Sequence, residues 1–282
     1  MRNIRIFLFL LIGGVCMLVC PSCNTCSRQQ TVEDITIDLA DLAIDTSYVN
    51  MARKVFYALP TPIELAMLIK NLGIVYQPAL LNDPANASKY MTNQKMALNF
   101  GVYVTDLTYA GLFEQSQTVL RYKLSIRKLT DGLGLQSAVD ISTMQQLEAN
   151  INDKDAVLRI VSDTYALCTA SLNESDRNSL TLAMFIGGWI EGMYIATNLL
   201  DEKLPSTADQ IKQLVIDQKL TFEMIWHVMS DMKEIPEVAG MINDISELAQ
   251  LLDKIDVDNI THEAYSEIKN QIQSLRQNIT NK

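Results

Sequence analysis

Apolar residues recur at intervals of three and four along most of this chain, which is the spacing of one face of an α-helix. Two such stripes follow each other near its end. They are Met241, Ile245, Leu248, Leu252 and Ile255, and then Ile260, Ala264, Ile268, Ile272, Leu275 and Ile279. The link at 256–259 is short, so the pattern predicts an antiparallel helical hairpin over 241–282. The sequence lacks the alternating pattern of strands, and we expect an all-α multi-helix bundle of about eight to ten helices.

Capping and turn residues divide the rest of the chain. Residues 61–64, Thr-Pro-Ile-Glu, have the composition of a helix start. Two long helices are predicted over 88–113 and 114–131, the second ended by Gly132 and Gly134. Farther along, the N-cap candidates are Ser137, Ser142, Asn152, Asn173 and Ser206.

Residues 180–200 are nearly all apolar or small and carry one charge, Glu191. In lipid that charge would cost several kcal/mol, so the pattern favours a buried central helix over a membrane span. Gly188, Gly192 and Ala196 lie four apart on one face, and they allow a neighbouring backbone to come close. Residues 101–111 share part of this pattern, by chance or by an internal duplication.

The first residues form an export signal. Arg2 and Arg5 precede an apolar run over 6–19, which is shorter than the roughly 20 residues of a membrane span. The run is followed by cysteines, and the segment resembles a bacterial lipoprotein signal, in which a peptidase cuts before a cysteine that then carries acyl chains such as palmitate. We therefore expect a signal peptide over 1–22, a polar tether over 23–32 and one helical domain over 33–282.

Cys23 is the favoured lipid attachment residue because the small Ser22 precedes it. Val19 before Cys20 is branched, and Cys26 lies far from the apolar run, but both cysteines stay open as alternatives because Cys20 and Pro21 are atypical residues at the positions before Ser22. Acyl chains on such a cysteine would hold the protein at a membrane. The residues that follow Cys23 lack early acidic residues, and the resemblance then implies the periplasmic face of the outer membrane.

Charge limits the kinds of partner. The chain has a formal charge of −10, and removal of 1–22 takes away Arg2 and Arg5 and no acid, which gives −12. An acidic protein is a poor ligand for phosphate backbones, so we expect no nucleic acid partner. About 260 residues, with 48% of the chain apolar, suffice for a large core. Cys168 lies in an apolar helical stretch, which predicts an inert core thiol.

Two carboxylates in apolar surroundings are the strongest candidates for chemistry. If the helices around Asp106 and Glu191 pack face to face, these carboxylates converge, and Tyr103, Tyr109 and Tyr194 lie near them. Such a cluster can bind a cation or a polar ligand, or act as acid and base. The alternative is structural: each carboxylate satisfies tyrosine hydroxyls, Arg121 or helix N-termini in the core.

Other chemistry has little support in the sequence. His227 and His262 are the only histidines, and neither belongs to a Glu-x-x-His pair. The sequence also lacks the motifs of common nucleophiles and phosphate-binding loops. We therefore predict no metal, no cofactor and no catalytic residue.

A family resemblance supports the location. The segments that carry it are Tyr57-Ala-Leu-Pro-Thr-Pro-Ile-Glu64, Leu80-Leu-Asn82, Lys89-Tyr90, Ala97-Leu-Asn-Phe-Gly-Val-Tyr103 with Asp106 and Tyr109, and Gly188-Trp-Ile-Glu191 with Tyr194. In these the chain resembles uncharacterised helical lipoproteins of Bacteroidetes-type bacteria. The resemblance implies an envelope location and no activity.

Three functions follow as hypotheses. The first is a lipid-anchored envelope lipoprotein whose helical domain binds a partner protein or a small ligand. The second is an enzyme or a cation site built on Asp106 and Glu191. The third is a structural or assembly protein that uses the C-terminal hairpin. An open cleft at the carboxylates would favour the second, and an exposed apolar stripe on the hairpin the third.

Overall fold

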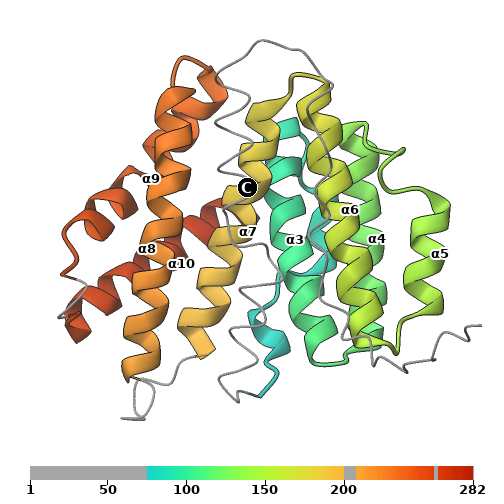
Figure 1. Ribbon diagram of the computed structural model, residues 1–282, viewed down its shortest axis with the longest axis horizontal. Helices are drawn as coiled ribbons and strands as arrows, with labels where there is room; N and C mark the ends of the chain where they lie inside the picture. Colours follow the sequence, from blue (N-terminus) through green and yellow to red (C-terminus); the bar gives the residue numbers. More distant parts are fainter. Residues whose placement is uncertain (1–74, 200–207, 257–259, 282) are drawn as a thin grey trace, which may run out of the picture. The chain divides into compact units, whose positions relative to one another are not determined.

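The computed structural model describes residues 75–199, 208–256 and 260–281 (Figure 1). The chain divides into two compact units, Met1–Asp45 and Thr46–Lys282, and all described residues belong to the second. The predicted signal peptide with Cys20, the tether with Cys23 and Cys26, and the helix start at 61–64 lie outside the described residues.

The described part of the chain contains helices and no strand, which confirms the all-α prediction. The α-helices are α3 (Asn93–Leu112), α4 (Ser116–Leu133), α5 (Ile141–Ala149), α6 (Lys154–Glu174), α7 (Asn178–Leu199), α8 (Ala208–Asp231), α9 (Pro236–Asp253) and α10 (His262–Thr280). Two 3-10 helices, η2 (Pro78–Leu80) and η3 (Pro84–Ser88), precede them.

Several predicted helix ends are wrong by a few residues. The helix predicted over 88–113 begins at 93, because the Thr92 side chain caps it by accepting a hydrogen bond from Lys95 N at 3.3 Å. Gly132 lies inside α4, and Gly134, at φ 73°, ends that helix.

The N-caps also differ from the prediction. Asp140, Asp153 and Thr261 cap α5, α6 and α10, each by accepting a hydrogen bond from the N–H three residues later. Ser142 is the second residue of α5 and Asn173 the second-last residue of α6, so neither occupies the N-cap position before a helix.

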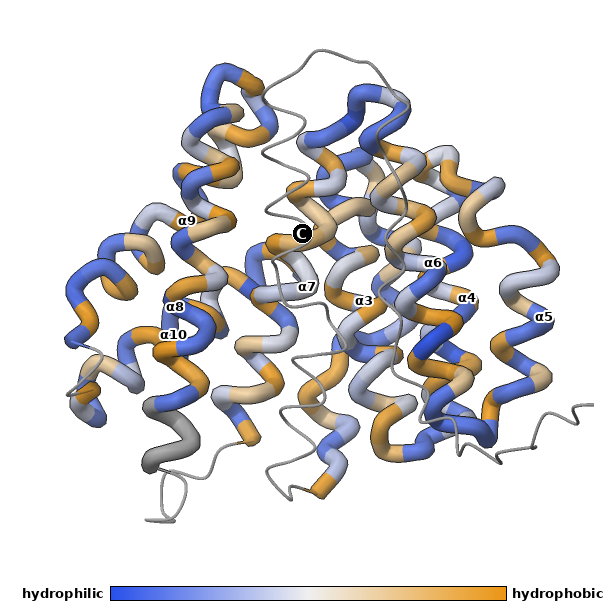
Figure 2. The backbone as a smooth tube through the Cα atoms, viewed as in Figure 1, coloured by the Kyte–Doolittle hydropathy of each residue, from blue (hydrophilic) through white to orange (hydrophobic). Residues whose placement is uncertain are grey.

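Helices α3 and α7 form the centre of the described bundle (Figure 1). Helices α4, α6 and α10 pack on α3, and α6, α8 and α10 pack on α7. By length and composition α7 could cross a membrane, yet 89% of its most apolar window is buried within the protein. Figure 2 shows hydrophilic residues along α5 and α6 and few along α7. The prediction of a buried central helix over 180–200 is therefore confirmed for the described residues 180–199.

Glycines bring the backbones of α3 and α7 into contact. A Cβ atom on Gly101 would lie 2.0 Å from Met184 O, and one on Gly187 would lie 1.9 Å from Leu98 O. Across the same contact the Thr105 hydroxyl donates to Gly188 O at 3.2 Å. The predicted close approach is confirmed, although Gly187, and not only the face with Gly188, makes it. This contact sets the depth of every side chain between the two helices.

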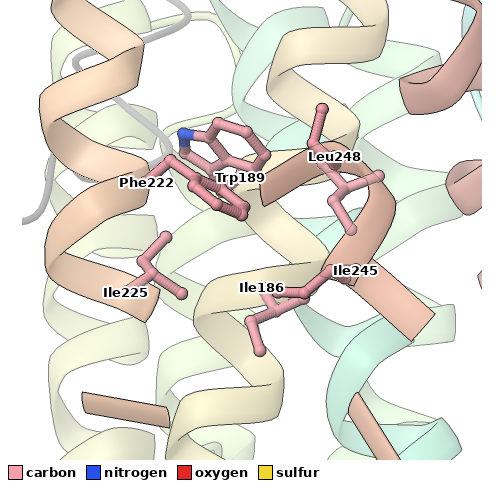
Figure 3. A pocket seen from close by; sticks show the side chains of 7 residues that line it. Ile186, Trp189, Phe222, Ile225, Ile245 and Leu248 are labelled. Atoms are coloured by element: carbon pink, nitrogen blue, oxygen red, sulfur yellow. The ribbon is translucent and has the colours of Figure 1, made fainter. Parts of the chain in front are cut away.

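Helices α7, α8 and α9 meet through apolar side chains that leave no room for water (Figure 3). Trp189 of α7 packs against Phe222 of α8 with ring centroids 5.3 Å apart. The Trp189 indole N–H donates to Gln218 Oε1 at 2.8 Å, so its one polar atom is satisfied. A tilted aromatic contact and a hydrogen bond thus join α8 to the core.

The predicted C-terminal hairpin is present as α9 and α10, which contact each other. The predicted stripes are its inner faces, since Met241, Ile245, Leu248, Leu252, Ile268, Ile272 and Leu275 are all buried. Helix α10 also packs on α7 and α3, so the hairpin belongs to the main body. The apolar stripe on which an assembly role would depend is covered.

Replacement of Gly187 by Ala should destabilise the protein by about 3 kcal/mol, because the new methyl group would overlap the Leu98 carbonyl and force α3 and α7 apart. Chemical denaturation measures the loss. Gly240→Ala in α9 is the matched control: nothing lies within 4 Å of its Cβ position, so it should gain about 0.5 to 1 kcal/mol from helix propensity. Equal effects of the two substitutions would contradict the close approach.

Candidate functional site

The contact between α3 and α7 brings the two predicted carboxyl groups together. Asp106 of α3 and Glu191 of α7 are both 0% exposed. Burial raises the pKa of Asp106, and the charge of the nearby Glu191 carboxylate raises it further. The hypothesis that the two residues converge is therefore supported by the geometry.

Arg276 of α10 neutralises Glu191. Its Nε donates to Glu191 Oε2 at 2.9 Å and its Nη2 donates to Oε1 at 3.0 Å. The guanidinium also lies over the Tyr194 ring, 4.3 Å from the ring centroid. Burial lowers the pKa of Arg276, but the Glu191 carboxylate more than offsets this and the net shift is upward. The pair is thus a bidentate, charged contact in the core, and the cation is Arg276 rather than Arg121.

Asp106 has a different role from Glu191. Its Oδ2 accepts a hydrogen bond from Asn82 N at 3.1 Å, while its Oδ1 has no hydrogen-bond donor among the described residues. Burial, and next the Glu191 carboxylate, raise the pKa of Asp106 well above its usual value. A proton on Asp106 gives Oδ1 a hydrogen to share with Glu191 and removes one buried charge. The group of three then holds one negative and one positive charge.

The rest of the site binds a stretch of backbone. Residues 80–84 connect η2 and η3, so most of their backbone groups lack helical partners. Five side chains supply those partners, and we call them the loop clamp. They are Arg276 on Leu80 O (2.9 Å), Asp106 on Asn82 N (3.1 Å), Tyr122 on Asn82 O (2.6 Å), Tyr103 on Asp83 O (2.9 Å) and Ser125 on Pro84 O (2.9 Å).

The loop clamp depends on neutral tyrosines. Burial raises the pKa of both Tyr103 and Tyr122, so their hydroxyls remain protonated and able to donate. Tyr90 extends the network: its hydroxyl accepts from Asn82 Nδ2 at 3.0 Å and donates to Thr280 O at 3.0 Å. The carbonyl at the end of α10 is satisfied in this way.

The structure places the three predicted tyrosines in different surroundings. Tyr103 belongs to the loop clamp, and Tyr194 supports Arg276 from below. Tyr109 lies in a separate aromatic group, where it stacks on Tyr76 with centroids 5.2 Å apart and accepts from Gln77 N at 3.0 Å. Only the first two therefore belong to the site around the carboxyl pair.

Sequence reasoning missed half of the site. Asn82, Tyr90, Tyr122, Ser125 and Arg276 are absent from the predicted set. One signal was available for the arginine: Arg276 is the only arginine over 178–282, and it follows the apolar Leu275 directly on a helix stripe. A basic residue beside a buried stripe points to a buried acid. Nothing in the sequence marks Tyr122 and Ser125 as partners of 80–84.

Comparison with protein-family models, with curated proteins and with solved structures found no match.

The chemistry of the site is that of a structural network. Each carboxyl has a partner in the chain, the guanidinium is shared between Glu191 and Leu80 O, and the tyrosine hydroxyls bind backbone carbonyls. The buried thiol of Cys168 is likewise inert, because burial raises its pKa to about 12. The outcome corresponds to the structural alternative for Asp106 and Glu191.

Asp106→Asn should fold with nearly unchanged stability at neutral pH, since the amide keeps an acceptor for Asn82 N and replaces the carboxyl proton by an N–H. Glu191→Gln should cost about 3 kcal/mol, because it leaves the Arg276 charge buried without its partner. Chemical denaturation of both variants at pH 7 checks the contrast. If the Asn variant lost as much as the Gln variant, Asp106 would be ionised in the folded protein.

The raised pKa of Asp106 also sets a pH dependence. Its folded pKa lies above the unfolded value of about 3.9, so the folded state holds the proton more tightly. The resulting stability is fully present below about pH 3.9 and is lost as the pH rises through the folded pKa. The free energy of unfolding of the wild type, minus that of Asp106→Asn, should therefore fall from pH 4 to pH 9. A difference that grew with pH would contradict the assignment.

Proposed function

We propose that this protein is a lipid-anchored cell-envelope lipoprotein whose helical domain is a rigid, non-catalytic binding module. The observation that carries the second half is the full burial of Asp106 and Glu191 together with their internal hydrogen bonds. An acid–base catalyst has to reach the proton of a substrate within hydrogen-bond distance. Groups that are 0% exposed and bound to Arg276 and to Asn82 are better suited to fixing a scaffold.

The first half of the proposal comes from the leader. The basic start, the apolar run over 6–19 and the cysteines after it support export and acylation at Cys23. The resemblance to helical lipoproteins supports the same location, and the absence of early acidic residues after Cys23 favours the periplasmic face of the outer membrane. The formal charge of −12 after removal of 1–22 supports a partner other than nucleic acid.

Acyl labelling tests the anchor. Cells that produce Cys23→Ser should incorporate no labelled palmitate into this protein, because the acylated sulfur is gone. Cys20→Ser and Cys26→Ser are matched controls and should label as the wild type does. Labelling that persists in Cys23→Ser and disappears in either control would move the attachment residue to that cysteine.

Native purification from the cell envelope tests the binding role. A partner or ligand that co-purifies with the wild type should also be recovered with Asp106→Asn, because the substitution keeps the hydrogen bonds of the scaffold. Recovery is measured by mass spectrometry. Loss of the bound species from a well-folded Asp106→Asn protein would instead favour the second hypothesis, a functional site at the carboxyl pair.

A further inference from the structure

A groove lies between α8 and α9, away from the carboxyl pair. It has a volume of about 470 Å³ and is lined from Phe222 to Ser230 on one helix and from Ser246 to Asp253 on the other. Small-molecule sites commonly fall between about 300 and 1,000 Å³. The eight or nine residues on each side span about 12 Å at the rise of an α-helix, which is the length of a small ligand.

The wall of the groove is aromatic and firmly held. Phe222 is 4% exposed and packs on Trp189 at the junction of α7, α8 and α9 (Figure 3). Trp226 stacks on Phe222 with ring centroids 6.2 Å apart and an angle of 22° between the rings, and it is only partly buried. An indole supported from behind in this way is a preorganised surface for an apolar group or for a cation.

The rim of the groove is acidic. Glu223 and Asp253 line it, both exposed, and the described residues that line it include no lysine or arginine. His227 also lines it, and its Nε2 lies 3.8 Å from Asp231 Oδ2, so Asp231 offsets its charge when it is protonated. Lys219 lies at 4.0 Å from Glu223 and donates to Ile255 O at 3.5 Å, so it offsets the rim charge only in part. Asp253 is also the last residue of α9, where the helix dipole adds negative potential.

We propose that this groove binds a small organic cation: an ammonium group between Glu223 and Asp253, with an aryl or alkyl body on Trp226. The size of the groove favours a small molecule over a protein surface, since a stable protein interface buries about 800 Å² on each partner. The net charge of the whole chain, −10, has the same sign as the rim of the groove and also attracts a cationic ligand. The proposal rests on the proposed binding role and gives it a location and a ligand class.

Three probes that share a phenylalkyl chain and differ in their terminal functional group test this site. They are 4-phenylbutylamine, 4-phenylbutanol and 4-phenylbutyrate, titrated against the full-length protein in vesicles of neutral phosphatidylcholine and followed by tryptophan fluorescence. Empty vesicles correct for partition of each probe. The amine should bind with a Kd of about 1 mM or tighter, the alcohol more weakly, and the acid without saturation. Trp226→Phe identifies the reporting indole, because Trp189 is the only other tryptophan.

Matched charge variants separate the groove from general electrostatics. Asp253→Asn and Glu223→Gln should each weaken the amine about fivefold. Asp244→Asn removes the same charge from an exposed position of α9 outside the groove and should change the Kd less than twofold. Thermal melts verify that all three variants fold.

Three results would overturn the proposal. The first is equal binding of the amine and the alcohol, and the second is no saturable binding of the amine by the folded protein. The third is an equal effect of Asp244→Asn and Asp253→Asn on the Kd of the amine. None of them would change the acyl labelling of Cys23, so a failure of the groove is distinguishable from a failure of the anchor. If a ligand of another chemical class co-purifies and binds Trp226→Phe as well as the wild type, the protein is still a binding protein, but this groove is not its binding site.

Discussion

The structure depends on placing two carboxyl groups and one guanidinium inside a helical core without an unpaired charge. Burial makes each ionised group costly, so the charges have to cancel locally. Glu191 and Arg276 cancel through two parallel hydrogen bonds, while burial and the Glu191 charge raise the pKa of Asp106 and so favour its neutral form. This arrangement joins α3, α7 and α10, three elements that are far apart in the sequence, at one point.

Around that point, polar side chains satisfy a segment that secondary structure leaves unsatisfied. Residues 80–84 have a mostly irregular backbone and lie partly against the core, with Asn82 buried, and buried N–H and C=O groups are tolerated only when they find partners. The loop clamp supplies them from three helices. A cluster of tyrosines and carboxyls that has the composition of an active site therefore serves to fix the chain. The groove between α8 and α9, with its aromatic wall and acidic rim, is more accessible to a ligand than the buried carboxyl pair.

The fold was largely predictable from the sequence, because helical periodicity and the hairpin stripes report directly which residues are buried. The convergence of Asp106 and Glu191 was also predictable, since glycine-rich apolar helices pack closely. Arg276 was not identified, because its contact to Glu191 spans 85 positions and no local pattern encodes it. The loop clamp was missed for a related reason: its partners are backbone atoms, which every residue has. The helix N-caps show the limit of predictions from local sequence, because Ser142 and Asn173 are residue types that favour N-caps and yet lie within α5 and α6.

The contact of Arg276 has a consequence for the order in which the chain acquires its structure. Glu191 is synthesised 85 residues before its cation, and Leu80 196 residues before it. Until position 276 exists, Glu191 lacks the guanidinium with which it pairs in the core. Contacts of such sequence separation form late and slow the acquisition of the native state. A nascent chain would thus remain loosely collapsed, in a form accessible to chaperones and proteases, until α10 is synthesised and packs on the core. A chain truncated before α10 would remain in that form.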